Sequence, residues 1–287
     1  MRLSHELTTI RTGRINSRKK SSPEFEQYLR ASPLIALDVG ARLTRADGVV
    51  DNTFLDPLIN NNPDFFSVIF CEADKTEAAV LKSFGLDVIP VALGRTKRIG
   101  KLFVTADPGC SSFYSPNSEI IQFYDGKAGL ERFDIVDELE VTIDTLSNQL
   151  QELGKKHLDY LKIDTQGSEL DVLNGLGDFR PFLIKTEVSA IPLYRDQPLC
   201  FEIEAFLGSL GYLKFHESFR PFLAFGDQNP DVHEKIHTST PLPLHGDAWF
   251  CPNLGTQEGR SIALRDVGKF DAAMRLVGLD GYVKSLL

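Results

Sequence analysis

Short apolar runs that alternate with helical patterns constrain the fold of this chain more than any other feature of its sequence. A helical pattern follows directly after several of these runs, as it does over 75–85. Buried parallel strands joined by helices produce this alternation. The sequence therefore predicts an α/β fold, with a mostly parallel sheet and helices on both faces. The predicted strands occupy residues 33–41, 66–74, 86–94, 158–164, 181–189 and 245–253.

Length and composition favour a single globular domain. The chain has 287 residues, of which 42% are hydrophobic and 25% charged, as in soluble proteins with a full-sized core. We predict one domain over 33–287, preceded by a basic extension over 1–32 that contains a short helix at 23–31. The extension includes RTGRINSRKKSS, which we interpret as a solvated lead-in. Contact of this segment with nucleic acid or anionic lipid is the alternative.

Charge and hydropathy argue against two classes of partner. The formal net charge is −9, whereas nucleic-acid binding needs a basic surface. No apolar stretch approaches the roughly 18 residues that a membrane-spanning helix requires. We therefore expect no nucleic-acid partner and no membrane partner.

The cysteines and histidines show no metal-ligand spacing, so we predict no metal site. A disulfide framework is not indicated either, and a reducing, cytoplasmic location is the simplest setting. The cysteines are Cys71, Cys110, Cys200 and Cys251.

Acidic residues close four separate apolar runs. Because the carboxyl ends of parallel strands meet at one edge of a sheet, we expect these acids to converge on a ligand site there. Ordinary solvation of strand ends is the alternative. An acid at the end of the second strand typically accepts hydrogen bonds from ribose hydroxyls. The four acids are Asp38, Glu72, Asp164 and Glu187.

The segment LDYLKIDTQGSELDVL places a lysine inside a buried strand. Lys162 and Asp164 share one side of that strand, because side chains alternate. A buried lysine needs a carboxylate partner, and Asp164, Asp38 and Glu187 are the candidates. A structural ion pair and a catalytic lysine both remain open.

The start of the following helix has two interpretations. Ser168 and Asp171 resemble a capping box, and Glu169 in the first turn suits the positive end of the helix dipole. A role for Glu169 in the site is the alternative.

Two further segments carry candidate polar groups. The loop over 107–118 could cover a pocket with the hydroxyls of Ser111 and Ser112, or serve only as a turn. His245 and Asp247 could form a proton-relay pair, although such spacing also occurs in simple turns.

The sequence resembles the FkbM family of S-adenosylmethionine-dependent methyltransferases over about 34–250. This resemblance implies a Rossmann-like class I methyltransferase fold, with a seven-stranded sheet whose last strand is antiparallel. It also implies S-adenosylmethionine as the cofactor. The segments that carry it, in the family's order, are LIALDVGA, FCEAD, VIPVALG, VTIDTL, DYLKIDTQGSELDVLNG and LIKTEVS.

The resemblance also implies roles for individual residues. The methionine and ribose portion would lie against Asp38, Gly40 and Ala41, and Glu72 would hold the ribose hydroxyls. Val91 and Ala92 would flank the adenine, and Asp164 would face the sulfonium. The chain departs from the family after DVGA, where it has RLTRADGVVDNTF over 42–54 and Gly48 stands in for an earlier small residue.

These observations lead to a predicted function. The chain is expected to O-methylate a hydroxyl of a small molecule or carbohydrate, with a general base chosen from Asp164, Glu169 and Glu187, and with His245 ranked behind them. A nicotinamide-dependent oxidoreductase is one alternative, although the G-x-G-x-x-G fingerprint is missing. A non-catalytic cofactor-binding or interaction protein is another. The sequence leaves open whether the chain works alone or as a homo-oligomer.

Overall fold

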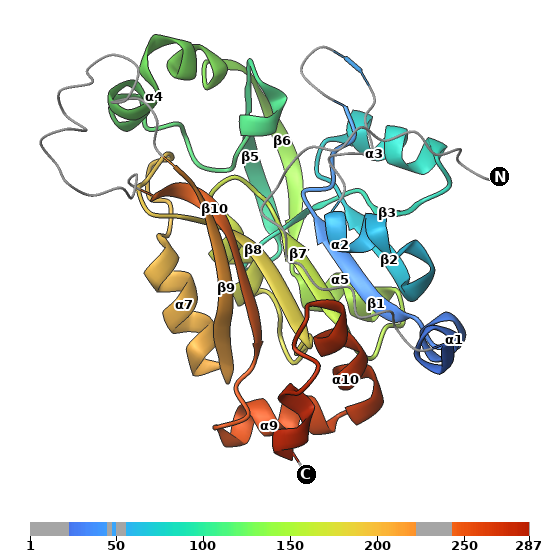
Figure 1. Cartoon of the computed structure of the whole chain (residues 1–287). Helices are drawn as coiled ribbons and strands as arrows, with labels where there is room; N and C mark the ends of the chain where they lie inside the picture. The colour runs from blue at the N-terminus through green and yellow to red at the C-terminus, as the bar shows by residue number, and fades with distance from the viewer. Residues whose placement is uncertain (1–22, 45–47, 50–55, 222–242, 287) are drawn as a thin grey trace, which may run out of the picture.

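The computed structural model describes residues 23–44, 48–49, 56–221 and 243–286 (Figure 1). Its centre is a seven-stranded sheet in the order β3-β2-β1-β7-β8-β10-β9. Strand β10 is antiparallel to both of its neighbours, and the strands from β3 to β8 are parallel. This confirms the predicted mostly parallel sheet with an antiparallel last strand. The strands are β1 (Leu34–Val39), β2 (Phe66–Cys71), β3 (Asp87–Ile89), β7 (Tyr160–Ile163), β8 (Leu183–Ser189), β9 (Tyr212–Pro221) and β10 (Pro243–Pro252).

The strand order reverses between β1 and β7. From β1 the chain builds outward through β2 and β3, and from β7 it builds the other way through β8. Ligands of open α/β sheets bind beyond the carboxyl ends of the strands at such a reversal. The fold therefore directs attention to the residues that follow β1 and β7.

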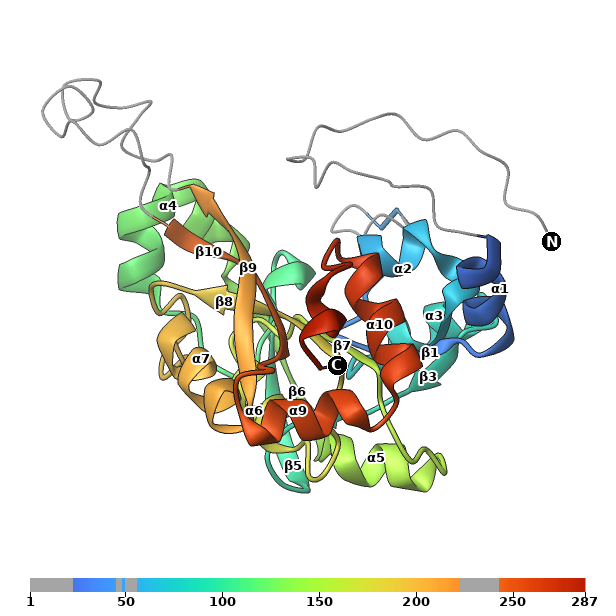
Figure 2. The ribbon, with the colours of Figure 1, turned by 60° about the horizontal axis from the view of Figure 1, so that its bottom comes forward.

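Helices cover both faces of the sheet (Figures 1 and 2). One face carries α2 (Pro57–Asn61), α3 (Lys75–Ser83) and α10 (Val267–Leu276), and the other carries α5 (Leu146–Glu152), α6 (Glu169–Asn174) and α7 (Cys200–Ser209). Apolar side chains of both layers pack on the strands in one large core, and α3 adds Leu81 to a separate cluster with Phe70. Burial of these side chains on both faces explains why the strands are almost uniformly apolar.

The third predicted strand is split, so the prediction of one strand over 86–94 is wrong. Strand β3 ends at Ile89, and β4 (Ala92–Leu93) leaves the main sheet. Pro90 lies between them and has no backbone N–H to continue the ladder.

Strand β4 joins a second, three-stranded sheet in the order β4-β6-β5. Strand β5 (Arg98–Thr105) is antiparallel to β6 (Ile135–Asp144), and between them lie the short helix η3 (Pro108–Cys110) and α4 (Ser118–Arg132). Figure 1 shows α4 at the top of the molecule. This inserted segment stands at the end of the main sheet where the acids were predicted to meet.

The two ends of the described chain pack against the same core. Helix α1 (Pro23–Ala31) buries Leu29 completely, and the ring of Phe25 meets Phe65 edge to face. After α9 (Gln257–Leu264) and α10, the chain turns at Gly278 into the short helix η4 (Tyr282–Leu286). The predicted basic lead-in before α1 lies outside the described residues, and the predicted boundary at residue 33 stays a prediction.

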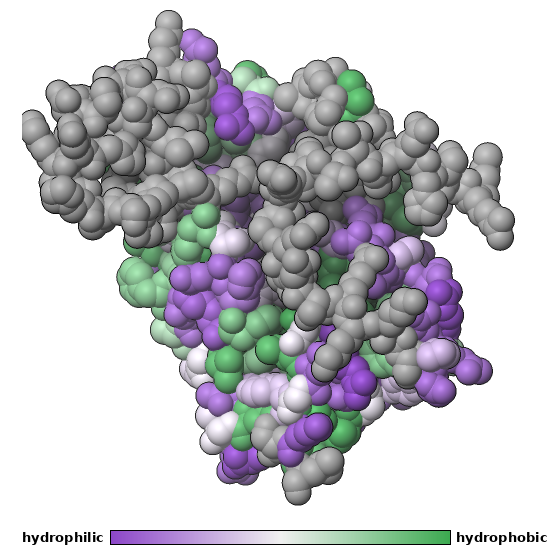
Figure 3. All heavy atoms as spheres, viewed as in Figure 1, coloured by the Kyte–Doolittle hydropathy of each residue, from purple (hydrophilic) through white to green (hydrophobic). Residues whose placement is uncertain are grey.

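Hydrophilic and hydrophobic residues stand side by side on the face drawn in Figure 3. Among the described residues, no helix has the length and apolar character needed to cross a membrane.

Candidate active site

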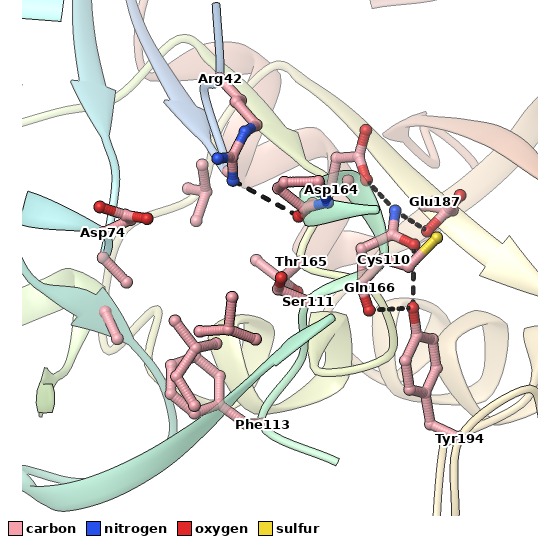
Figure 4. Close-up of a pocket in the computed structure, with 18 of the residues that line it drawn as sticks. Arg42, Asp74, Cys110, Ser111, Phe113, Asp164, Thr165, Gln166, Glu187 and Tyr194 are labelled. Carbon is pink, nitrogen blue, oxygen red and sulfur yellow. Dashed lines mark hydrogen bonds between the residues drawn. The ribbon is translucent and has the colours of Figure 1, made fainter. Parts of the chain in front are cut away.

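A cavity of about 490 Å³ opens beyond the carboxyl ends of β1, β2, β7 and β8 (Figure 4). Five of the eight predicted site residues line it: Gly40, Glu72, Ala92, Asp164 and Glu187. They come from strands far apart in the sequence, and three of the four acids predicted to converge, Glu72, Asp164 and Glu187, line this one space. The other three, Asp38, Ala41 and Glu169, are buried outside the lining.

Gly40 brings the ends of β1 and β7 together. Its φ of +79° lies in the left-handed region that favours glycine. Its N–H donates to the carbonyl of Cys71 at 3.0 Å, and the N–H of Asp164 donates to the carbonyl of Val39 at 3.0 Å. Backbone hydrogen bonds therefore join the ends of β1, β2 and β7 beside the cavity.

One half of the cavity presents a carboxylate beside an apolar wall. Glu72 follows β2 and is only 9% exposed, with Oε1 accepting from the N–H of Asp74 at 2.7 Å. Burial raises the pKa of Glu72 to about 7. The apolar side of this half comes from Val91 and Ala92. This half would fit a nucleoside-like group. The carboxylate would accept from its hydroxyls, the apolar wall would pack on its base, and Gly40 would lie beside the substituent that the sugar carries.

Arg42 also lines this half, and the sequence did not single it out. Its Nη2 lies 3.2 Å from Oε1 of Glu77, and its Nη1 donates to the carbonyl of Pro108 at 3.4 Å. The guanidinium therefore ties the chain after β1 to α3 and η3.

The atypical segment after DVGA is only partly described. Leu43 is buried and packs with Phe70 and Leu81, so it does not line the cavity. Gly48 is exposed with a φ of +77°. Residues 45–47 and 50–55 lie outside the described residues, and the predicted role of Gly48 stays a prediction.

A buried ion pair lies beneath the cavity. Lys162 Nζ is 3.0 Å from Oδ1 of Asp38 and 3.7 Å from Oδ2 of Asp164, so two of its three predicted partners contact it. Burial raises the pKa of Asp38, and Lys162 opposes this shift. Burial also works against the charge on Lys162, but the nearby carboxylates outweigh it and raise the lysine pKa. Among the described residues, no well-aligned hydrogen bond reaches the Asp38 oxygens, so the contact is mainly electrostatic.

Glu169 holds the turn that follows β7. Its Oε1 accepts from the N–H groups of Thr165 at 2.9 Å and Gly167 at 3.0 Å, and from Oγ1 of Thr165 at 3.1 Å. Burial raises the pKa of Glu169 to about 8. The predicted capping box is wrong, because the Ser168 side chain accepts no hydrogen bond from α6. Its hydroxyl points back and donates to the carbonyl of Thr165 at 3.4 Å.

The other half of the cavity is polar at its base. Glu187 Oε1 lies 3.1 Å from Nδ1 of His245, and Glu187 Oε2 accepts from Gln166 at 3.0 Å. The sequence had offered Asp247 only as a possible partner of His245, with a simple turn as the alternative. Asp247 lies 3.3 Å from Nζ of Lys185 instead. Gln166 was not predicted as a site residue, and no spacing pattern marks it.

The loop over 107–118 covers this half. Ser111 lines the cavity, whereas Ser112 is buried and its hydroxyl donates to the carbonyl of Gln166 at 2.6 Å. The hydroxyl of Tyr194 donates to the carbonyl of Cys110 at 2.9 Å. These bonds fix an apolar cluster over the cavity, formed by Cys110, Ile121, Phe133 and Tyr194.

Two known proteins or families are similar to this chain. Magnesium protoporphyrin IX methyltransferase from Synechocystis PCC 6803, solved with bound S-adenosylmethionine, is similar at 10% identity and a TM-score of 0.35. That alignment covers 80% of this chain and 76% of the other. A search of curated proteins found no match. A sequence profile described as the methyltransferase FkbM domain matches residues 38–214, more than half of the chain. The chain belongs to the FkbM family of S-adenosylmethionine-dependent methyltransferases.

Proposed function

We propose that this protein transfers the methyl group of S-adenosylmethionine to a hydroxyl oxygen of a small molecule or sugar. The observation that carries the proposal is the continuity of the cavity. Glu72 on one side and Glu187 on the other line the same space, and Asp164 stands between their strands. Figure 4 shows Asp164 and Thr165 between Asp74 on one side and Glu187 on the other.

The half of the cavity around Glu72 suits the cofactor. Gly40 would lie against its backbone-like portion, Glu72 would accept from the ribose hydroxyls, and Ala92 would pack on the base. Asp164 would place a negative charge near the sulfonium. When bound, S-adenosylmethionine supplies an electrophilic methyl group carried by a positively charged sulfur.

The half around Glu187 suits a hydroxyl acceptor. An alcohol is a weak nucleophile, so a base within hydrogen-bond reach accelerates its attack. Glu187 is only partly exposed, with its side chain at 18%, and it contacts His245. The apolar cluster above it would exclude water and hold the acceptor in line, which is a large part of the rate enhancement of such transfers.

The three predicted bases are not equivalent in position. Asp164 and Glu187 line the cavity, whereas Glu169 points its carboxylate into the turn over 165–167. We therefore favour Glu187 as the residue next to the acceptor and Asp164 as the residue next to the cofactor. Glu169 would act by shaping the turn that carries Gln166.

Calorimetry with S-adenosylmethionine, S-adenosylhomocysteine and NAD tests the cofactor half. We expect binding of the two adenosyl compounds, and a loss of about tenfold to a hundredfold in S-adenosylhomocysteine affinity for Glu72→Ala, because charged hydrogen bonds are lost. Glu258→Ala, an exposed acid on α9, is the control and should bind as the wild type does. Binding of NAD alone would refute the proposal.

The acceptor half needs a second experiment. A panel of sugars and hydroxylated small molecules would be incubated with S-adenosylmethionine, beside matched amines and thiols. A methyl ether in the product, identified by nuclear magnetic resonance, would support transfer to oxygen. Methylation confined to amines or thiols would exclude O-methylation while leaving the cofactor assignment intact.

A further inference from the structure

Gln166 has an unusual backbone conformation at the edge of the cavity. Its φ is +55°, and Asp196 is the one other described non-glycine residue with a positive φ. Such a conformation is unfavourable for a side-chain-bearing residue and persists where surrounding contacts enforce it. Here the carbonyl of Gln166 accepts the Ser112 hydroxyl at 2.6 Å. The strained backbone aims the Gln166 side chain into the cavity (Figure 4).

The amide of Gln166 joins two carboxylates. Its Nε2 donates to Oδ1 of Asp164 at 2.8 Å and to Oε2 of Glu187 at 3.0 Å. A primary amide nitrogen carries two N–H groups, so both are used. The amide oxygen lies 3.2 Å from the Tyr194 hydroxyl. The reverse orientation would turn an acceptor toward two carboxylates, so this one follows from the chemistry.

This arrangement has an electrostatic consequence. Two carboxylates that flank one point repel each other, and without a donor between them one tends to hold a proton. Donation by one amide to both favours the state in which both are charged.

The nearby basic groups approach the pair differently from Gln166. Lys162 lies 3.7 Å from Asp164, and His245 approaches Glu187 on the opposite oxygen. The amide of Gln166 donates to both carboxylates at once. The titratable groups that face the pair from the packed elements are Lys162 of β7, Asp38 of β1, Glu169 of α6, Cys110 of η3, Tyr194 of the loop after β8, and His245 of β10.

We propose that Gln166 is a positioning residue that keeps Asp164 and Glu187 ionised side by side, one toward the cofactor and the other toward the acceptor. This inference rests on the proposed function. In the transfer, the acceptor O–H bond breaks and its proton passes to the pair formed by Glu187 and His245. The new C–O bond forms as the methyl–sulfur bond breaks, and the sulfur leaves as a neutral thioether. Without Gln166, the two carboxylates would share one proton and carry one negative charge instead of two.

The test compares S-adenosylmethionine, which carries a positive sulfur, with S-adenosylhomocysteine, which does not. It needs no acceptor. Affinities for both are measured by calorimetry between about pH 5 and about pH 9, the range in which carboxyl and imidazole groups titrate. An ionised Asp164 makes the wild type prefer the charged ligand, and the preference should persist into the lower half of this range.

Gln166→Met keeps the length of the side chain and removes both donors. We expect its preference for the charged ligand to fall by about tenfold in the lower half of the pH range and to recover at high pH. In Gln166→Met/Glu187→Gln, Asp164 has no competing carboxylate, so the preference should return. Gln151→Met, an equivalent change at an exposed glutamine of α5, should keep the wild-type ratio.

The outcomes are separable. An unchanged ratio in Gln166→Met at every pH, or failure of the double variant to restore it, overturns the inference. Should Gln166→Met not fold, Gln166→Asn tolerates the left-handed backbone but is too short to span both carboxylates, and the same loss is expected. A wild type that binds both ligands with equal affinity overturns the role of Gln166 and leaves the proposed function standing. A wild type that binds neither overturns the proposed function itself.

Discussion

Gly40 lies directly against the backbone carbonyl of Asp164, and a Cβ built on Gly40 would stand 1.8 Å from that oxygen. No rotation of a side chain relieves such an overlap, because the obstacle is main chain. The ends of β1 and β7 touch at this point, and they do so only because residue 40 has no side chain.

Gly40→Ala should therefore destabilise the protein and weaken S-adenosylhomocysteine binding by more than about tenfold, since the backbone beside the cavity must move. Gly85→Ala is the matched control, with a similar φ of +76° and open space around its Cβ. Both variants share the left-handed penalty of roughly 1 kcal/mol. Urea unfolding and calorimetry on the two proteins would separate the shared penalty from the clash. Equal losses in the two variants would show that the contact with Asp164 is unimportant.

Lys162→Met should lower the free energy of unfolding by about 3–5 kcal/mol, because it leaves the buried Asp38 carboxylate without its cation. Adding Asp38→Asn removes the stranded charge, and the double variant should recover most of the stability. Urea denaturation measures all three proteins. Lys101→Met, which removes an exposed partner of Glu138, is the control and should change stability by less than about 1 kcal/mol. A small effect of Lys162→Met would mean that the buried pair is replaceable.

The pKa of Glu72, raised by burial to about 7, predicts opposite pH trends for binding and folding. Under the proposed function, the ionised carboxylate would accept from both ribose hydroxyls, so S-adenosylhomocysteine affinity should rise with pH through about 7 and then level off. Folding follows the reverse sign, because a raised carboxyl pKa favours the folded state at low pH. That contribution is complete below the ordinary value of 4.5 and is lost as pH rises through about 7. Glu72→Gln should flatten both trends, and calorimetry with thermal unfolding across this range checks them.

Glu169→Gln and Glu169→Ala distinguish a structural acid from a base. Glutamine keeps an oxygen for the N–H groups of Thr165 and Gly167 and removes a buried charge, so it should retain the fold and gain stability above about pH 8. Alanine leaves those two donors unsatisfied and should cost about 1–3 kcal/mol for each. Once an acceptor is identified, substantial turnover by Glu169→Gln would confirm the structural role. Its abolition in a folded protein would restore Glu169 as a candidate base.

Strand geometry made part of this site predictable. Side chains alternate along a strand, so Lys162 and Asp164 had to share one side, and a buried lysine needed a carboxylate. The convergence of Glu72, Asp164 and Glu187 followed from the parallel sheet alone, because the carboxyl ends of such strands meet at one edge.

Other features depend on geometry that no local pattern encodes. His245 and Glu187 are 58 positions apart, and they meet because of the register between β8 and the antiparallel β10. The bridging role of Gln166 depends on a backbone angle that is enforced by Ser112 from a distant loop. One strand was predicted over 86–94, so neither the break at Pro90 nor the second sheet that β4 joins was predicted.

That second sheet also leaves and rejoins the main body at one place, since the N–H of Gly94 donates to the carbonyl of Asp144 at 2.9 Å. The stretch between them forms a cassette whose two ends are neighbours, and it supplies Ser111 and Phe113 to the cavity. An inserted segment with adjacent ends can be exchanged during evolution without changing the path of the chain through the rest of the domain. Under the proposed function, a descendant could change what it methylates by replacing this one insert and inherit the methyl-donor machinery intact.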